Sequence, residues 1–228
     1  MKFPNAAKGV KKLLRAQIIA LLATIAGIAT VLTAAVGQVP TENEEQFERL
    51  LKQGDPALIG MLVAGGCALV FFFYSALINI LGYLRTARDE DGFKKAVILT
   101  VISIALNALS SFLQPRGGFI GWLGTASSVF SQIMELLATI AAIVGLMDLS
   151  EKCGRPDMVN RGASVMRLLE GTYILSFIFV IVTQMFRQNA FNDFIADALA
   201  LSATFLAAVR YVLYFIYLGK ASKMLKET

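Results

Sequence analysis

The chain has 228 residues, of which 57% are hydrophobic and 16% charged, with a net charge of +5 and no histidine. Soluble domains carry about 25% charged residues, so this composition excludes an ordinary soluble enzyme, a coiled coil and a disordered chain. The lack of histidine also removes the commonest acid–base side chain and most zinc and haem ligation.

Long apolar runs dominate the chain. A membrane-spanning helix needs about 20 apolar residues, and these runs are continuous rather than alternating, which favours helices over an outer-membrane barrel. The sequence therefore predicts an all-α integral membrane protein in which residues 1–228 form a single polytopic domain with six transmembrane helices. The predicted spans are residues 16–36, 57–84, 96–113, 126–147, 166–186 and 196–218.

Basic residues set the predicted orientation. Most of the 21 Lys and Arg residues lie before the first span, after the sixth, and between spans two and three or four and five. Because Lys and Arg are retained on the cytoplasmic side, both termini are predicted to be cytoplasmic, and the spans pair as three helical hairpins. The net positive charge is then explained by the orientation of the chain in the membrane, so no nucleic-acid partner is expected. From the chain's size, we expect the bacterial cytoplasmic membrane.

The first span has an alternative interpretation as a cleaved signal peptide. It has a basic start, an apolar stretch and small residues at positions 35–37. Its apolar run of about 20 residues is long for a signal peptide, so we expect a retained helix.

The segment 38–56 is the predicted external loop. Thr41 and Glu44 have the spacing of a capping box, and apolar residues at 47, 50 and 51 fall on one helical face. The turn at residues 54–56 ends the element. We expect a short amphipathic helix on the outer surface, acting as a connector or, alternatively, as a lid.

A threefold repeat is a second prediction. Short glycine-containing motifs precede the odd-numbered spans, at Gly9, Gly92 and, more weakly, Gly162. The predicted repeat units are residues 9–91, 92–161 and 162–228. The alternative is that any hairpin with basic flanks would look similar.

Glu135 is the clearest candidate for a functional residue. It lies 12 residues from the inner end of the fourth predicted span, about 18 Å at 1.5 Å per residue, and therefore near the membrane midplane. A charge there costs roughly 2.5–3.5 kcal/mol, so a carboxylate at this depth indicates a function. Gln132 and Thr139 lie on the same helical face.

Polar residues on two other spans join this candidate site. Ser103 and Asn107 lie on one face of the third span, and Arg210 lies in the sixth at nearly the depth of Glu135. We therefore predict a contact between Glu135 and Arg210. The alternative is structural: the small polar residues join neighbouring helices, and the charges form an ion pair.

The function predicted from the sequence is binding or translocation of a polar solute or ion in a pocket between helices 3, 4 and 6. Its residues would be Glu135, Arg210, Gln132, Asn107, Ser103 and Thr139. An enzyme is the less favoured class, because no catalytic constellation, cofactor motif or metal cluster is present. The alternative function is a membrane scaffold or assembly subunit that engages a protein partner, or a second copy of itself, through Arg85 and Arg88.

Overall fold

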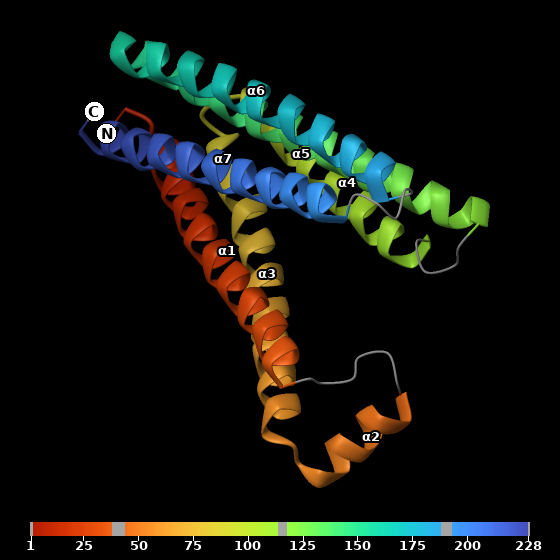
Figure 1. Cartoon of the computed structure of the whole chain (residues 1–228). Helices are drawn as coiled ribbons and strands as arrows, with labels where there is room; N and C mark the ends of the chain where they lie inside the picture. The colour runs from red at the N-terminus through yellow and green to blue at the C-terminus, as the bar shows by residue number, and fades with distance from the viewer. Residues whose placement is uncertain (1, 38–43, 114–117, 188–192, 228) are drawn as a thin grey trace. The chain divides into compact units, whose positions relative to one another are not determined.

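A computed structural model of the chain describes residues 2–37, 44–113, 118–187 and 193–227. Its elements are all helices (Figure 1). In chain order they are α1 (Pro4–Val36), α2 (Glu44–Gln53), α3 (Pro56–Thr86), α4 (Gly92–Leu113), α5 (Gly118–Lys152), α6 (Pro156–Arg187) and α7 (Asp193–Glu227).

Local sequence explains where several helices begin and end. Helices α1, α3 and α6 each begin at a proline, whose fixed φ and missing N–H suit the first helical position. The Asp55 carboxylate accepts hydrogen bonds from the N–H groups of Ala57 and Leu58, both at 2.9 Å. Gly54 and Gly154 follow α2 and α5 with φ of 69° and 71°, a left-handed conformation that favours glycine. The predicted capping residue Thr41 lies outside the described residues.

Within the described residues, five helical segments are long and apolar enough to cross a membrane. They are Pro4–Val36, Pro56–Thr86, Gly92–Leu113, Ile120–Lys152 and Thr204–Glu227. Helix α6, which contains the predicted fifth span, is not among them, and it carries Arg167 and Glu170 among its apolar residues. An all-helical chain with several membrane-spanning helices is therefore confirmed, whereas the six-span topology stays a prediction.

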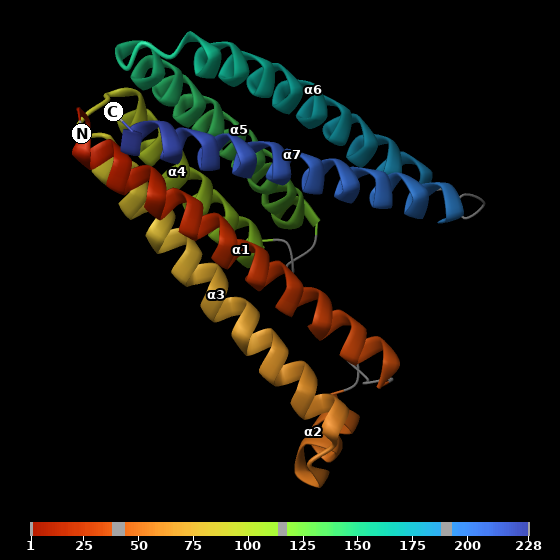
Figure 2. The same cartoon turned by 90° about the vertical axis from the view of Figure 1, so that its left-hand side faces the viewer.

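The chain divides into two compact units. The second unit, Lys12–Leu81, contains most of α1, all of α2 and most of α3. Helices α1 and α3 lie side by side in both views (Figures 1 and 2). The Ser75 hydroxyl donates to the Ala16 carbonyl at 2.9 Å, which joins the two helices through a polar contact.

The first unit, Met1–Lys11 with Gly82–Thr228, is built on two hairpins. Helix α4 packs along α5 and α6 packs along α7, while α5 also packs on α6 and touches α7 over a short stretch. The start of α1 and the last turn of α3 belong to this unit.

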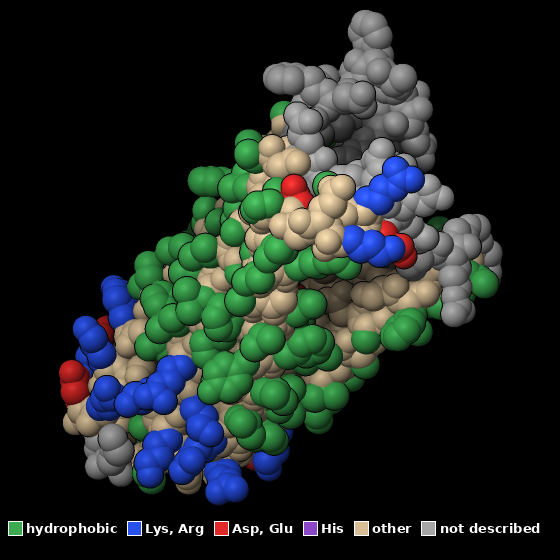
Figure 3. All heavy atoms as spheres, turned by 90° about the horizontal axis from the view of Figure 1, so that it is seen from below, with side chains coloured by type: hydrophobic (Ala, Val, Ile, Leu, Met, Phe, Trp, Pro, Cys, Tyr) green, Lys and Arg blue, Asp and Glu red, His purple; other side chains and the backbone are tan. Residues whose placement is uncertain are grey.

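The core of the first unit lies at one end, which we call the basic end. Both chain termini, the α3–α4 turn and the α5–α6 turn are held together there. Lys2 Nζ donates to the Lys152 carbonyl at 2.9 Å, and the Ala6 N–H donates to the Asp89 carboxylate at 2.7 Å. Lys and Arg side chains gather at one end of the face in Figure 3, beside a broad hydrophobic surface. The fully buried side chains of the core at the basic end include Val10, Phe93, Leu146, Leu149, Leu169, Tyr217 and Leu225.

Three glycines allow close helix contacts at the basic end. A Cβ placed on Gly9 would lie 2.8 Å from the Gly82 carbonyl oxygen, and one on Gly92 would lie 3.1 Å from the Gly145 Cα. A Cβ on Gly162 would lie 2.5 Å from the Tyr217 hydroxyl. These are the glycines that the sequence aligns as a threefold repeat. The repeat itself stays a prediction.

Large apolar side chains away from the basic end are exposed. Phe112 on α4 is 72% exposed and Phe205 on α7 is 69% exposed. A soluble protein rarely leaves contiguous apolar patches of this kind open, whereas lipid solvates them. The exposure of these apolar side chains therefore agrees with helices that span a membrane.

Candidate functional site

Glu135 has no polar partner for its carboxylate among the described residues. It lies in the apolar stretch of α5, and its side chain is exposed. Its carboxylate forms no hydrogen bond or ion pair with a described residue. Only its backbone carbonyl is used, as the acceptor of a 3.0 Å hydrogen bond from the Thr139 hydroxyl.

Arg210 on α7 is held by an aromatic ring instead of a carboxylate. Its guanidinium carbon lies 3.9 Å from the centroid of the Tyr173 ring on α6. A planar and weakly hydrated guanidinium stacks well on an aromatic face, which leaves its N–H edges uncovered. The ion pair implied by the predicted Glu135–Arg210 contact is not formed, because Arg210 packs on Tyr173.

The two charges nevertheless belong to one cluster. Glu135 and Arg210 interact electrostatically, and both interact with the Tyr173 hydroxyl. The cluster draws one residue from each of three helices, α5, α6 and α7. Sequence reasoning missed Tyr173, because an aromatic residue in an apolar run carries no signal of a cation on a neighbouring helix.

The other predicted pocket residues lie in different surroundings. Ser103 on α4 is buried, and its hydroxyl lies 3.1 Å from the Ser131 hydroxyl of α5. Ser131 in turn donates to the Ser103 carbonyl at 2.9 Å, so this serine pair joins α4 to α5. Asn107 and Gln132 have exposed side chains, and the Thr139 hydroxyl bonds back to its own helix.

The helix packing indicates that α6, rather than α4, is the third helix of this site beside α5 and α7. Helix α4 packs along α5, and α6 packs against both α5 and α7. The sequence predicted helices 3, 4 and 6, which correspond to α4, α5 and α7. The observed contact of Arg210 comes from α6 instead.

Arg85 and Arg88, the predicted partner-binding residues, lie near the α3–α4 turn. Arg88 is exposed, whereas Arg85 is half-buried and its buried Nε atom has no hydrogen-bond partner in the part of the chain that the structure describes. Next to them, the Asp89 carboxylate accepts hydrogen bonds from Ala6 N–H and from Asn5 Nδ2 at 3.0 Å. The turn therefore serves the packing of α1 as well as any partner.

Paired charges surround the basic end. Lys152 forms an ion pair with Glu90, and Arg155 lies 3.8 Å from the Glu227 carboxylate. Lys94 Nζ lies 2.7 Å from the Asp91 carboxylate, and this hydrogen bond and its positive charge lower the pKa of Asp91. The Lys152–Glu90 pair joins the end of α5 to the α3–α4 turn, and the Arg155–Glu227 contact joins the α5–α6 turn to the end of α7.

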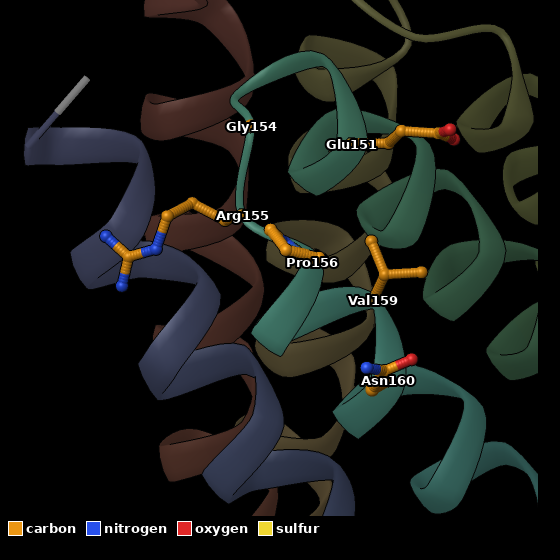
Figure 4. Close-up of a pocket in the computed structure, with 6 residues that line it drawn as sticks. All are labelled: Glu151, Gly154, Arg155, Pro156, Val159 and Asn160. Carbon is orange, nitrogen blue, oxygen red and sulfur yellow. The ribbon is translucent and has the colours of Figure 1, made fainter.

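Two surface hollows lie at the basic end, and the first is lined by four charged side chains, Glu90, Asp148, Glu151 and Lys152. One lies beside the Glu90–Lys152 pair, and the other surrounds the α5–α6 turn (Figure 4). In the second, Glu151 and Arg155 point in opposite directions. Among the residues that the structure describes, no group of three His, Cys, Asp or Glu side chains is placed to hold a metal ion.

The fold and the apolar helices define the class: this chain is an all-helical, multi-pass membrane protein. Comparison with protein-family models, with curated proteins and with solved structures finds no match. Its more particular function therefore rests on the residues of the site.

Proposed function

We propose that this protein binds a small polar solute or ion at Glu135 and Arg210 and carries it across the membrane. The observation that carries the proposal is that these opposite charges lie in one cluster of apolar helices without forming an ion pair with each other. Each charge costs roughly 2.5–3.5 kcal/mol in a bilayer centre. A polar ligand that binds both charged groups would offset part of that free-energy cost.

The neighbouring residues suit the edges of such a site. Gln132 lies three residues before Glu135 and Thr139 four residues after it, on the same face of α5. The exposed Gln132 amide has both donors and acceptors to offer a solute. Asn107 on α4 and the buried Ser103–Ser131 contact are assigned to its periphery.

We further propose that the basic end faces the cytoplasm, in the cytoplasmic membrane of a bacterium. The gathering of Lys and Arg around both termini and two turns supports this orientation, because positive charges are retained on the cytoplasmic side.

Native mass spectrometry of the protein, mildly extracted from its own host, tests the proposal. Wild type is compared with Glu135→Gln, which keeps the size of the side chain but removes its charge. Glu170→Gln is the matched control, because Glu170 is another carboxylate within a long helix and is in no ion pair with a described residue.

A small molecule or ion that is retained by wild type and Glu170→Gln but lost from Glu135→Gln supports the proposal. A mass that is bound equally by all three proteins overturns the assignment to Glu135. A stoichiometric protein partner in all three, with no small ligand, overturns the proposal in favour of the scaffold function.

The scaffold function is the second candidate, and the exposed Arg88 together with the unpartnered Arg85 Nε favours it. Reversing both charges, with Arg85→Glu and Arg88→Glu, is expected to release such a partner. Solute binding at Glu135 is expected to survive that change.

A further inference from the structure

Helix α7 carries a stripe of polar residues that leads from the charged cluster to the basic end. Arg210, Tyr214 and Tyr217 are spaced by four and three residues and therefore share one helical face. Seven residues of helix correspond to about 10 Å along the axis. Beyond Tyr217, the exposed Lys220 marks the surface of the basic end.

Hydroxyl groups from two other helices join this stripe. The Tyr83 hydroxyl, at the end of α3, lies 3.3 Å from the Tyr214 hydroxyl, and both side chains are buried. The Tyr173 hydroxyl interacts electrostatically with Tyr83 as well as with Glu135. Tyr214 interacts in the same way with Tyr217. Four of the six tyrosines thus lie along this stripe: Tyr173 at Arg210, the Tyr83–Tyr214 pair one turn of α7 further on, and Tyr217 nearly one turn beyond that pair.

The far end of this row holds a hydroxyl that packing does not explain. Tyr217 is fully buried, its hydroxyl lies against Gly162 of α6, and no described residue forms a hydrogen bond with that hydroxyl. Phenylalanine would fill the same space without the penalty of an unsatisfied hydroxyl. Ser176, one turn beyond Tyr173 on α6, is a second buried hydroxyl of this kind. Buried polar groups without a protein partner are commonly satisfied by internal water.

We propose that Glu135, Tyr173, Tyr83, Tyr214 and Tyr217, joined by internal water, form a proton path between the charged cluster and the basic end. A hydroxyl both donates and accepts a hydrogen bond, so it can accept a proton on one side and release its own on the other. One proton enters at the Glu135 carboxylate and one leaves from Tyr217 to water at the basic end. The hydroxyls then rotate back, and no electron moves.

The charges around Glu135 suit this role. The titratable groups that interact with it are Arg210 of α7 and Tyr173 of α6. Helix α4, which also packs on α5, carries only Lys94 and Lys95 as titratable groups, both at its beginning. After Glu135 gives up its proton, Arg210 stabilises the carboxylate that remains. The proton path itself does not require the proposed function. Only its coupling to the movement of a solute rests on that function.

Proton flux into vesicles tests the path. The purified full-length protein is placed in lipid vesicles with a pH-sensitive dye inside, and a potassium gradient with valinomycin sets the membrane potential. Wild type is expected to conduct protons above the level of empty vesicles. Tyr214→Phe and Tyr217→Phe keep the rings but remove the hydroxyls, and each is expected to lower the flux at least tenfold. Glu135→Gln is expected to abolish it.

Tyr74→Phe is the matched control, because Tyr74 is an exposed tyrosine of α3 outside the row. It is expected to conduct like wild type. The proton path is overturned if wild type conducts no more than empty vesicles, or if Tyr214→Phe and Tyr217→Phe both conduct like wild type. Thermal unfolding of each variant shows whether it is folded.

Failure of the path and failure of the proposed function can be told apart. If the tyrosine variants and wild type bind the solute and Glu135→Gln does not, while no protein conducts protons, the solute site stands and the proton path is wrong. If protons are conducted through the row and no solute is bound, the path stands alone.

Discussion

The basic end and the Glu135 level share helices α5, α6 and α7, yet they are organised in opposite ways. At the basic end, glycines allow close contact, leucines are fully buried and Lys152 pairs with Glu90. At the Glu135 level, a carboxylate and a guanidinium lie in one cluster without pairing. The difference teaches that one end of the unit is closely packed with paired charges, whereas the other level holds two opposite charges that do not form an ion pair with each other.

The largest effect on the packed end is expected from Gly9→Ala. The new Cβ would lie 2.8 Å from the Gly82 carbonyl oxygen and 2.8 Å from the Thr86 backbone nitrogen, neither of which can rotate away. We expect the free energy of unfolding to fall by about 1–3 kcal/mol, the usual cost of overpacking. Thermal unfolding in detergent measures it.

Gly171→Ala is the control for this change, because nothing lies within 4 Å of a Cβ at that position of α6. Alanine favours the helix by about 0.5–1 kcal/mol, so this variant is expected to be slightly more stable. Equal losses from both substitutions would show that the glycine contacts of the basic end are not special.

A smaller loss is expected from Asp89→Ala. The Asp89 carboxylate accepts hydrogen bonds from the Ala6 N–H and the Asn5 side chain at the beginning of α1. Loss of such a cap costs about 1 kcal/mol. Asp89→Asn, which keeps an acceptor oxygen, is expected to lose less, and hydrogen exchange of the first turn of α1 reports the difference. Unchanged exchange in Asp89→Ala would contradict the capping role.

Ser103→Ala distinguishes a role of Ser103 in helix packing from a role in the solute site. The Ser103–Ser131 contact joins α4 to α5, and hydrogen bonds of this kind between membrane helices are worth about 0.6 kcal/mol. We expect a loss of that size in the free energy of unfolding and no change in solute binding. Loss of binding with unchanged stability would move Ser103 from helix packing into the solute site.

The smallest effect is expected from Lys94→Gln at the α3–α4 turn. Lys94 lowers the pKa of Asp91 below its ordinary value of 3.8, so their interaction stabilises the fold above that pH and is lost as the pH falls below it. Both side chains are exposed, which keeps the contribution small. Removal of Lys94 is expected to return the pKa of Asp91 toward 3.8 in an NMR titration, whereas Lys95→Gln is expected to leave it unchanged.

Composition and apolar runs were sufficient to predict an all-helical membrane protein, because lipid imposes simple rules on length and backbone hydrogen bonding. Residue counts along single helices also predicted that Glu135 and Arg210 lie near each other, which agrees with their electrostatic interaction, whereas the membrane depth of Glu135 stays a prediction. No pattern in the residues could place the Tyr173 ring against Arg210, since that contact depends on how α6 and α7 are rotated against each other. For the same reason, Ser103 was assigned to a pocket, whereas the structure places its hydroxyl between α4 and α5.

The most direct test of the unpaired charges is a double-mutant cycle on the free energy of unfolding. Glu135→Gln and Arg210→Gln are measured alone and together in bicelles, with helix loss followed on addition of a denaturing detergent. We expect a coupling below about 1 kcal/mol, because Arg210 is held by Tyr173 and forms no ion pair with Glu135. A coupling near 3–5 kcal/mol, the size of the loss from a broken buried ion pair, would contradict a site that is open to a ligand.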